Sequence, residues 1–106
     1  FDGTGGRFGD TAVAAASSDP AIATVYASVD AASDEPLVLV AINKSTGTTT
    51  AEILVTHTRA LAQGETWRID ASSATPRPGP ALQATARNTF RLEMPGSSVT
   101  TVRLTP

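Results

Sequence analysis

Acid–base and nucleophilic chemistry depends on a few side-chain types, and this sequence has one histidine, ten carboxylates and no cysteine. A nucleophilic triad needs a serine or cysteine beside a histidine and an orienting acid. His57 lies in a predicted strand, in phase with Ile53 and Val55, and a hydrogen-bonded, half-buried strand histidine is the favoured interpretation. A single imidazole is also a poor metal site, and a chain without cysteine offers no thiolate ligand.

Two facing carboxylates can cleave glycosidic bonds. Most acids of this chain fall in predicted turns or on the polar phase of strands, which is typical of solvated surface charge. Asp34 and Glu35 precede Pro36 in a turn and do not form an acid–base pair. We therefore predict no catalytic, cofactor-binding or metal-binding residue, and we expect that this chain alone is not an enzyme.

Four glycines fall within the first ten residues, in a pattern that is superficially similar to a phosphate-binding loop. The preceding strand and the Lys-Ser/Thr of a P-loop are absent. Asp2 and Asp10 could offer oxygen ligands to calcium, but the acid spacing of an EF-hand is missing. The pattern favours a glycine-rich linker or junction loop at residues 1–10, anchored by Phe8 in an apolar cleft, followed by one domain at residues 11–106.

Aromatic side chains are the platforms on which β-sandwich domains stack sugar rings, and Trp67 and Tyr26 are the natural candidates. Trp67 shares its strand phase with Ile69, which favours a buried core position. Tyr26 is out of phase with the apolar residues of its own strand and points to the opposite face. Tyr26 is therefore the candidate for a contact with sugar or with a neighbouring domain.

Short segments rich in Val, Ile and Thr alternate with turn residues along the chain, and no stretch has the apolar stripe of a helix. Strands are predicted at Thr11–Ala16, Ala23–Val29, Leu37–Asn43, Thr48–Thr58, Glu65–Asp70, Phe90–Met94 and Ser98–Leu104. This pattern predicts an all-β fold, an antiparallel, immunoglobulin-like β-sandwich of seven to eight short strands.

The segments between the predicted strands carry further expectations. Leu37–Asn43 is the strongest apolar run and predicts a central strand covered on both faces. Lys44–Gly47 is expected to close a hairpin. The three prolines at 76, 78 and 80 exclude a central strand or a helix interior, so residues 71–88 are expected to be loop-like.

Length and charge narrow the class of protein. The 106 residues suit one domain. The net charge of −2 gives no electrostatic case for nucleic acid as a partner. The longest apolar run is far shorter than the roughly 20 residues of a membrane span, so no membrane contact is expected. The chain begins at Phe1 with neither an initiator Met nor a signal peptide, and we interpret it as a piece of a longer polypeptide.

Several stretches of the chain resemble one known family. The opening has the pattern Phe-Asp-Gly-x-Gly-x-x-Phe-Gly-Asp-Thr and leads to Val-Tyr-Ala-Ser at residues 25–28. It resembles the carboxy-terminal β-sandwich of glycoside hydrolase family 44 endoglucanases. The run at residues 37–45 is similar to the central strand of that domain, and residues 92–102 are similar to its closing strand.

The resemblance implies a parent that is a secreted bacterial cellulase, hydrolysing internal β-1,4 bonds of glucans, xyloglucan or xylan with retention. Its two catalytic glutamates would lie in a (β/α)₈ barrel, and no position here matches their motifs. In such enzymes a strand from the amino-terminal side of the barrel can complete the sandwich. No cofactor is implied.

Three functions remain open. A non-catalytic accessory domain that packs on and stabilises the barrel predicts an apolar patch on an outer face, formed by the strand from Leu37 to Ile42 together with Tyr26. A carbohydrate-binding module for β-1,4-glucan or xylan chains, with polysaccharide as partner, predicts exposed coplanar aromatic rings. An unrelated adhesion or spacer domain of the same fold makes neither prediction.

Overall fold

The computed structural model describes residues 2, 5–17, 21–30, 37–57 and 59–106, and these contain nine strands and no helix. No helix able to cross a membrane occurs among them. The strands are β1 (Thr11–Val13), β2 (Ala23–Val29), β3 (Leu37–Asn43), β4 (Thr49–Leu54), β5 (Gln63–Asp70), β6 (Ser73–Pro78), β7 (Leu82–Gln83), β8 (Thr89–Met94) and β9 (Ser98–Thr105). The predicted all-β, antiparallel sandwich is thereby confirmed.

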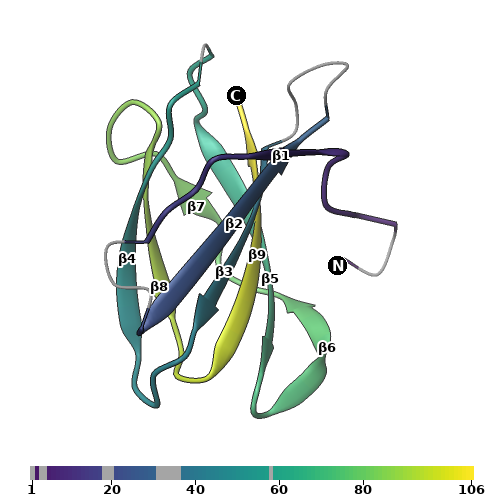
Figure 1. The fold of residues 1–106 in the computed structure, drawn as a ribbon, viewed down its shortest axis with the longest axis vertical. Coiled ribbons are helices and arrows are strands. Elements are labelled where there is room, and N and C mark those ends of the chain that lie inside the picture. The colour runs from purple at the N-terminus through teal and green to yellow at the C-terminus, as the bar shows by residue number, and fades with distance from the viewer. Residues whose placement is uncertain (1, 3–4, 18–20, 31–36, 58) are drawn as a thin grey trace.

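The strands form two sheets of unequal size. The large sheet has the order β1-β2-β3-β9-β5-β6, with β7 also paired to β5, and the small sheet consists of β4 and β8. All pairings are antiparallel. Figure 1 shows β4 and β8 as a layer on the left and the large sheet beside them, with β6 turned outward at the lower right.

The hydrophobic core lies between the sheets because one face of each strand is apolar. Leu39 is paired with Ala27 on β2 and with Val102 on β9, so these three side chains share the inner face of the large sheet. On the small sheet, β8 alternates as predicted. The buried core residues are Ala27, Val29, Leu37, Leu39, Ala41, Leu61, Leu82, Phe90, Leu92, Met94, Val102 and Leu104.

The turn at Lys44–Gly47 does not close a hairpin, which corrects the sequence-based expectation. It carries the chain from β3 in the large sheet to β4 in the small sheet, because both edges of β3 are already paired, with β2 and β9. The buried Asn43 stabilises this crossing. Its Nδ2 lies 3.1 Å from the carbonyl oxygens of Gly47 and Met94 and 2.9 Å from that of Pro95, so it joins the β3–β4 and β8–β9 turns.

Residues 71–88 are not wholly loop-like, since they contain β6 and β7. The prolines do exclude a central strand, and β6 is an edge strand that pairs with β5 on one side. Two predicted strands are shorter than expected, because β1 ends at Val13 and β4 ends at Leu54. The sequence predicted that β3 is covered on both faces. On its outer face Val38 is buried, whereas Val40 and Ile42 are half-buried.

Candidate functional site

The two aromatic candidates share the outer face of the large sheet, which points away from the small sheet. Strand register aligns one row across five strands, in which each residue is paired with the next: Tyr26, Val40, Thr101, Trp67 and Pro78. Tyr26 therefore points away from the core, as predicted. Trp67 lies on the same face as Tyr26, because its pairing with Thr101 sets it out of phase with the inward-facing Val102.

Trp67 and Tyr26 differ sharply in exposure. Trp67 is 8% exposed, whereas Tyr26 is 58% exposed. The predicted burial of Trp67 is confirmed, but its predicted place in the core is wrong, because it lies outside the cluster between the sheets. The guanidinium of Arg103 lies over the indole, with its carbon 5.0 Å from the ring centroid, which is within range of a cation–π interaction.

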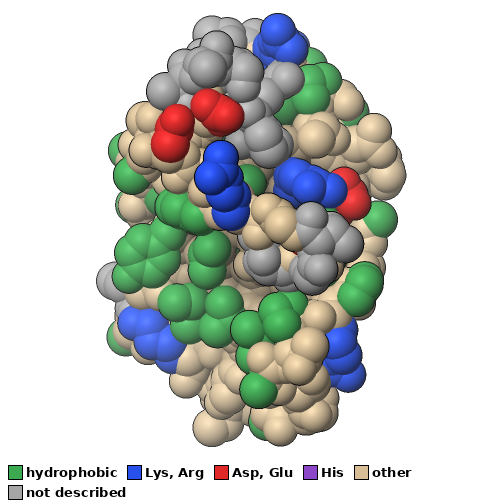
Figure 2. All heavy atoms as spheres, turned by 90° about the vertical axis from the view of Figure 1, so that its right-hand side faces the viewer, with side chains coloured by type: hydrophobic (Ala, Val, Ile, Leu, Met, Phe, Trp, Pro, Cys, Tyr) green, Lys and Arg blue, Asp and Glu red, His purple; other side chains and the backbone are tan. Residues whose placement is uncertain are grey.

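A second row extends the apolar surface. Ile42, Val99 and Ile69 are paired across β3, β9 and β5 on the same outer face; Ile42 and Val99 are half-buried and Ile69 is exposed. We call Tyr26, Val40, Ile42, Val99 and Ile69 the outer patch. Figure 2 shows hydrophobic side chains gathered across the middle of this face, with arginine and acidic side chains above them. Of the apolar patch expected on the strand from Leu37 to Ile42, Val40 and Ile42 lie on this surface together with Tyr26, whereas the other side chains of the strand are buried.

The opening segment lies beside the outer patch. Phe8 is 39% exposed, so it is not enclosed in an apolar cleft as expected. The segment is held instead by the N–H of Gly9, which donates to Ser28 Oγ at 2.7 Å, and by Asp2, whose carboxylate lies 3.8 Å from Arg103. The division into a linker at residues 1–10 and a domain at residues 11–106 stays a prediction.

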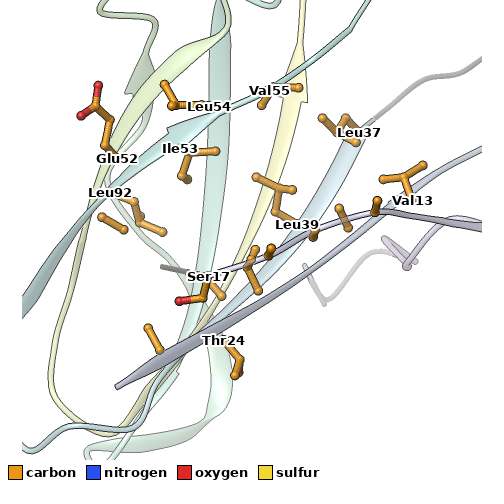
Figure 3. Close-up of a pocket in the computed structure, with 18 of the residues that line it drawn as sticks. Val13, Ser17, Thr24, Leu37, Leu39, Glu52, Ile53, Leu54, Val55 and Leu92 are labelled. Carbon is orange, nitrogen blue, oxygen red and sulfur yellow. The ribbon is translucent and has the colours of Figure 1, made fainter. Parts of the chain in front are cut away.

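A second surface is an open groove of about 830 Å³ between the two sheets, on the side of β2 and β4. Figure 3 shows Leu37 and Leu39 from the large sheet facing Ile53 and Leu92 from the small sheet across it. Ile53 is in the inward phase of β4 but is only half-buried. On this side of the sandwich the apolar side chains of Ile53 and Val55 are partly exposed, and they pack against the buried core.

Strand β4 has an edge beside this groove that pairs with no other described strand, residues 13–17 also line the groove, and the other three sheet edges are protected. The edge strand β1 has three residues, β6 carries Pro76 and Pro78, and Arg68 ties β8 to the large sheet through a 2.8 Å bond from Nη2 to the Glu93 carbonyl. β4 has six residues without proline. Within the described chain it pairs with β8 alone.

The polar candidates that the structure describes do not assemble into a reactive site, and Asp34 and Glu35 lie outside the described residues. His57 lies beyond the end of β4, not within a strand as predicted; it is half-buried, and its Nδ1 accepts a hydrogen bond from the Arg59 N–H at 3.0 Å. No three histidine or acidic side chains come close enough to hold a metal ion within the described ranges. The pKa of Asp70 is lowered because Ser72 donates its hydroxyl and its N–H to the carboxylate.

The chain is similar in structure to part of several glycoside hydrolases. A family 44 xyloglucanase from Paenibacillus polymyxa has a TM-score of 0.93 and 30% identity, over 99% of this chain and 21% of that chain. A family 44 endoglucanase from Clostridium thermocellum has a TM-score of 0.92 and 28% identity, over 97% and 20%. A bifunctional glucanase-xylanase from a metagenome library has a TM-score of 0.86 and 28% identity, over 98% and 20%.

This chain spans about one fifth of the length of each of these enzymes. No protein-family model and no curated protein matches it. The overlap with the solved structures nevertheless covers nearly all of its residues. The predicted resemblance is therefore confirmed: the chain has the fold of the carboxy-terminal β-sandwich domain of glycoside hydrolase family 44 endoglucanases.

Proposed function

We propose that this chain is a non-catalytic accessory domain of a polysaccharide-degrading glycoside hydrolase, and that it packs on and stabilises the catalytic barrel of that enzyme. The outer patch carries this proposal. Its side chains lie on the outer face of the large sheet, and its largest side chain, Tyr26, is 58% exposed. Contiguous apolar surface of this kind is uncommon on isolated domains and marks a contact with another body.

The partner that suits this patch is a domain of the same polypeptide. The matched enzymes are about five times longer than this chain, so most of their length lies outside the matched region. Interfaces between domains of one chain bury roughly 600–1,500 Å² and tolerate mixed polar and apolar character. The outer patch with its charged upper border has that character.

The groove beside β4 supports the same proposal through a second contact. An extended segment of the parent that lies along β4 would pair with its free edge and place apolar side chains over Ile53 and Leu39. A two-stranded sheet is marginally stable without further strands or packing. In the whole enzyme we expect the β4 amides to exchange hydrogen at least about tenfold more slowly than in this chain; equal rates would contradict this contact.

Carbohydrate binding is the alternative function, and it ranks second. A sugar platform needs exposed, coplanar rings. On the outer face Tyr26 is exposed, but Trp67 is buried beneath Arg103. Among the described residues Tyr26 is the one exposed ring that a strand carries, and with Phe8 on the opening segment as the other exposed ring it gives a weak site for a β-1,4-glucan or xylan chain. The parent would be a secreted bacterial endo-β-1,4-glucanase that acts with retention, and its catalytic residues would lie outside this chain.

The test compares one substitution in two settings. Tyr26→Lys places a charge in the outer patch, and Arg91→Gln on β8 is the control on the opposite face of the sandwich. We expect Tyr26→Lys to lower the melting temperature of the whole enzyme by several degrees and to leave that of this chain nearly unchanged. The control should change neither temperature.

Two results would overturn the proposal. The first is a whole enzyme that melts at the wild-type temperature with Tyr26→Lys. The second is saturable binding of cello- or xylo-oligosaccharides to this chain that Tyr26→Lys abolishes, which would establish the carbohydrate-binding function instead. Calorimetric titration of the isolated chain with these oligosaccharides distinguishes the accessory function from the carbohydrate-binding function.

A further inference from the structure

The opening segment, by which we mean Asp2 and residues 5–10, lies against the outer face of the large sheet. Residues 6–10 line one side of a small cavity of about 180 Å³, and Val38 and Arg103 line the other. Val38 points to the outer face, since it is paired with Arg103 and Ser28, yet it is only 1% exposed. The segment therefore covers this end of the sheet face, next to the outer patch.

Gly9 fixes one point of the segment through close backbone contact. Its N–H donates to the hydroxyl of the fully buried Ser28 at 2.7 Å. A Cβ atom at this position would collide with the backbone oxygen of Val29. Only glycine lets the segment approach β2 this closely.

Arg103 fixes a second point through its charge. Its Nη2 lies 2.9 Å from Glu65, its Nη1 lies 3.8 Å from Asp2, and its guanidinium covers Trp67. The side chain of Asp2 is only 8% exposed, and its Oδ1 accepts the N–H of Gly6 at 2.8 Å. A carboxylate this enclosed requires a positive partner and hydrogen bonds, and Arg103 supplies the positive charge.

We propose that the opening segment is a docked strap, held by Arg103 and Ser28, that fixes the orientation of the sandwich relative to the domain it accompanies. The strap covers Val38, and the outer patch begins at Val40, the next residue of β3 on the same face, so the strap sets which part of the sheet face the partner meets. The docking of the strap is a property of this chain alone. Its effect on orientation rests on the proposed function.

Hydrogen exchange in the isolated chain tests the docking. In the wild type we expect the amides of Gly6 and Gly9 to exchange at least about tenfold more slowly than in an unstructured peptide. Arg103→Gln and Gly9→Ala should each accelerate exchange in residues 6–10, by about threefold to tenfold, while β3 and β9 keep their protection. Arg91→Gln, an exposed arginine, and Gly47→Ala, where a Cβ meets nothing within 4 Å, are the matched controls and should change nothing.

Exchange of residues 6–10 at peptide rates in the wild type would overturn the docking, as would unchanged rates in both variants. Distances between spin labels on the two domains of the whole enzyme test the orientation. The wild type should give one narrow distribution and Gly9→Ala a broader one, and identical distributions would refute the effect on orientation. If Tyr26→Lys leaves the whole enzyme unchanged while the strap stays docked, the proposed function fails and the docked strap stands.

Discussion

Trp67 on the outer face should contribute more to stability than any other residue outside the core. A buried tryptophan removes about 200 Å² from water, and at about 25 cal/mol per Å² this is an upper bound of about 5 kcal/mol. Trp67 is 8% exposed, and Arg103 stacks on it, which adds about 0.5–1 kcal/mol. Because water can fill part of the gap at a sheet face, we expect Trp67→Ala to lower the free energy of unfolding by about 3–4 kcal/mol.

Urea unfolding of this chain measures that loss. Far-UV circular dichroism is the appropriate signal, because Trp67 is the single tryptophan and its removal abolishes the tryptophan fluorescence. Tyr26→Ala is the control on the same face: at 58% exposure it should cost only about 1 kcal/mol. A loss below about 1 kcal/mol for Trp67→Ala, or wild-type fluorescence that acrylamide quenches like that of a free indole, would refute the assigned burial.

Three further predictions concern the turns. Asn43→Ala should cost about 1–3 kcal/mol in urea unfolding, because the carbonyl of Met94 loses a buried donor and the carbonyls of Gly47 and Pro95 keep only the hydroxyls of Ser45 and Ser98; a cost below about 0.5 kcal/mol would contradict the bridging role. Gly96→Ala should lower the melting temperature, since its Cβ would collide with the backbone of residue 46, whereas Gly47→Ala should melt as the wild type does. In an NMR titration the pKa of Asp70 should lie below 3.8, and it should be higher in the Ser72→Ala variant. Because the folded pKa is lowered, its small stabilising effect is present above pH 4 and is lost as the pH falls through the folded pKa; equal pKa values in both proteins would exclude the Ser72 hydrogen bond as the cause.

Local patterns determined all the described strands except β6 and β7, and they determined the relative directions of neighbouring side chains. The alternation at Phe90–Met94 placed Phe90, Leu92 and Met94 on one buried face. The same alternation placed Tyr26 opposite the apolar residues of its strand. These inferences hold because successive side chains of a strand point to opposite faces, whatever the strand pairs with.

The sequence could not show which face of a strand meets the core. Alternation relates Trp67 to Ile69, but it does not say that their shared face is the outer one. That choice follows from the pairing of β5 with β9, in which Thr66 is opposite the inward-facing Val102 and Trp67 is opposite Thr101. This pairing joins residues more than thirty positions apart, so no local pattern contains it.

Sheet membership was also decided by long-range pairing. The residues at 44–47 have the composition of a hairpin turn, and a two-stranded hairpin of β3 and β4 satisfies every local rule. In the folded chain β2 and β9 occupy both edges of β3, so β4 pairs with β8 instead and leaves one edge open beside the groove. The sequence by itself determined an all-β sandwich with Tyr26 outside its core. Only the tertiary structure decided the extent of the outer patch, the groove and the position of Trp67 on the outer face, because each is made by strands that are distant in the chain.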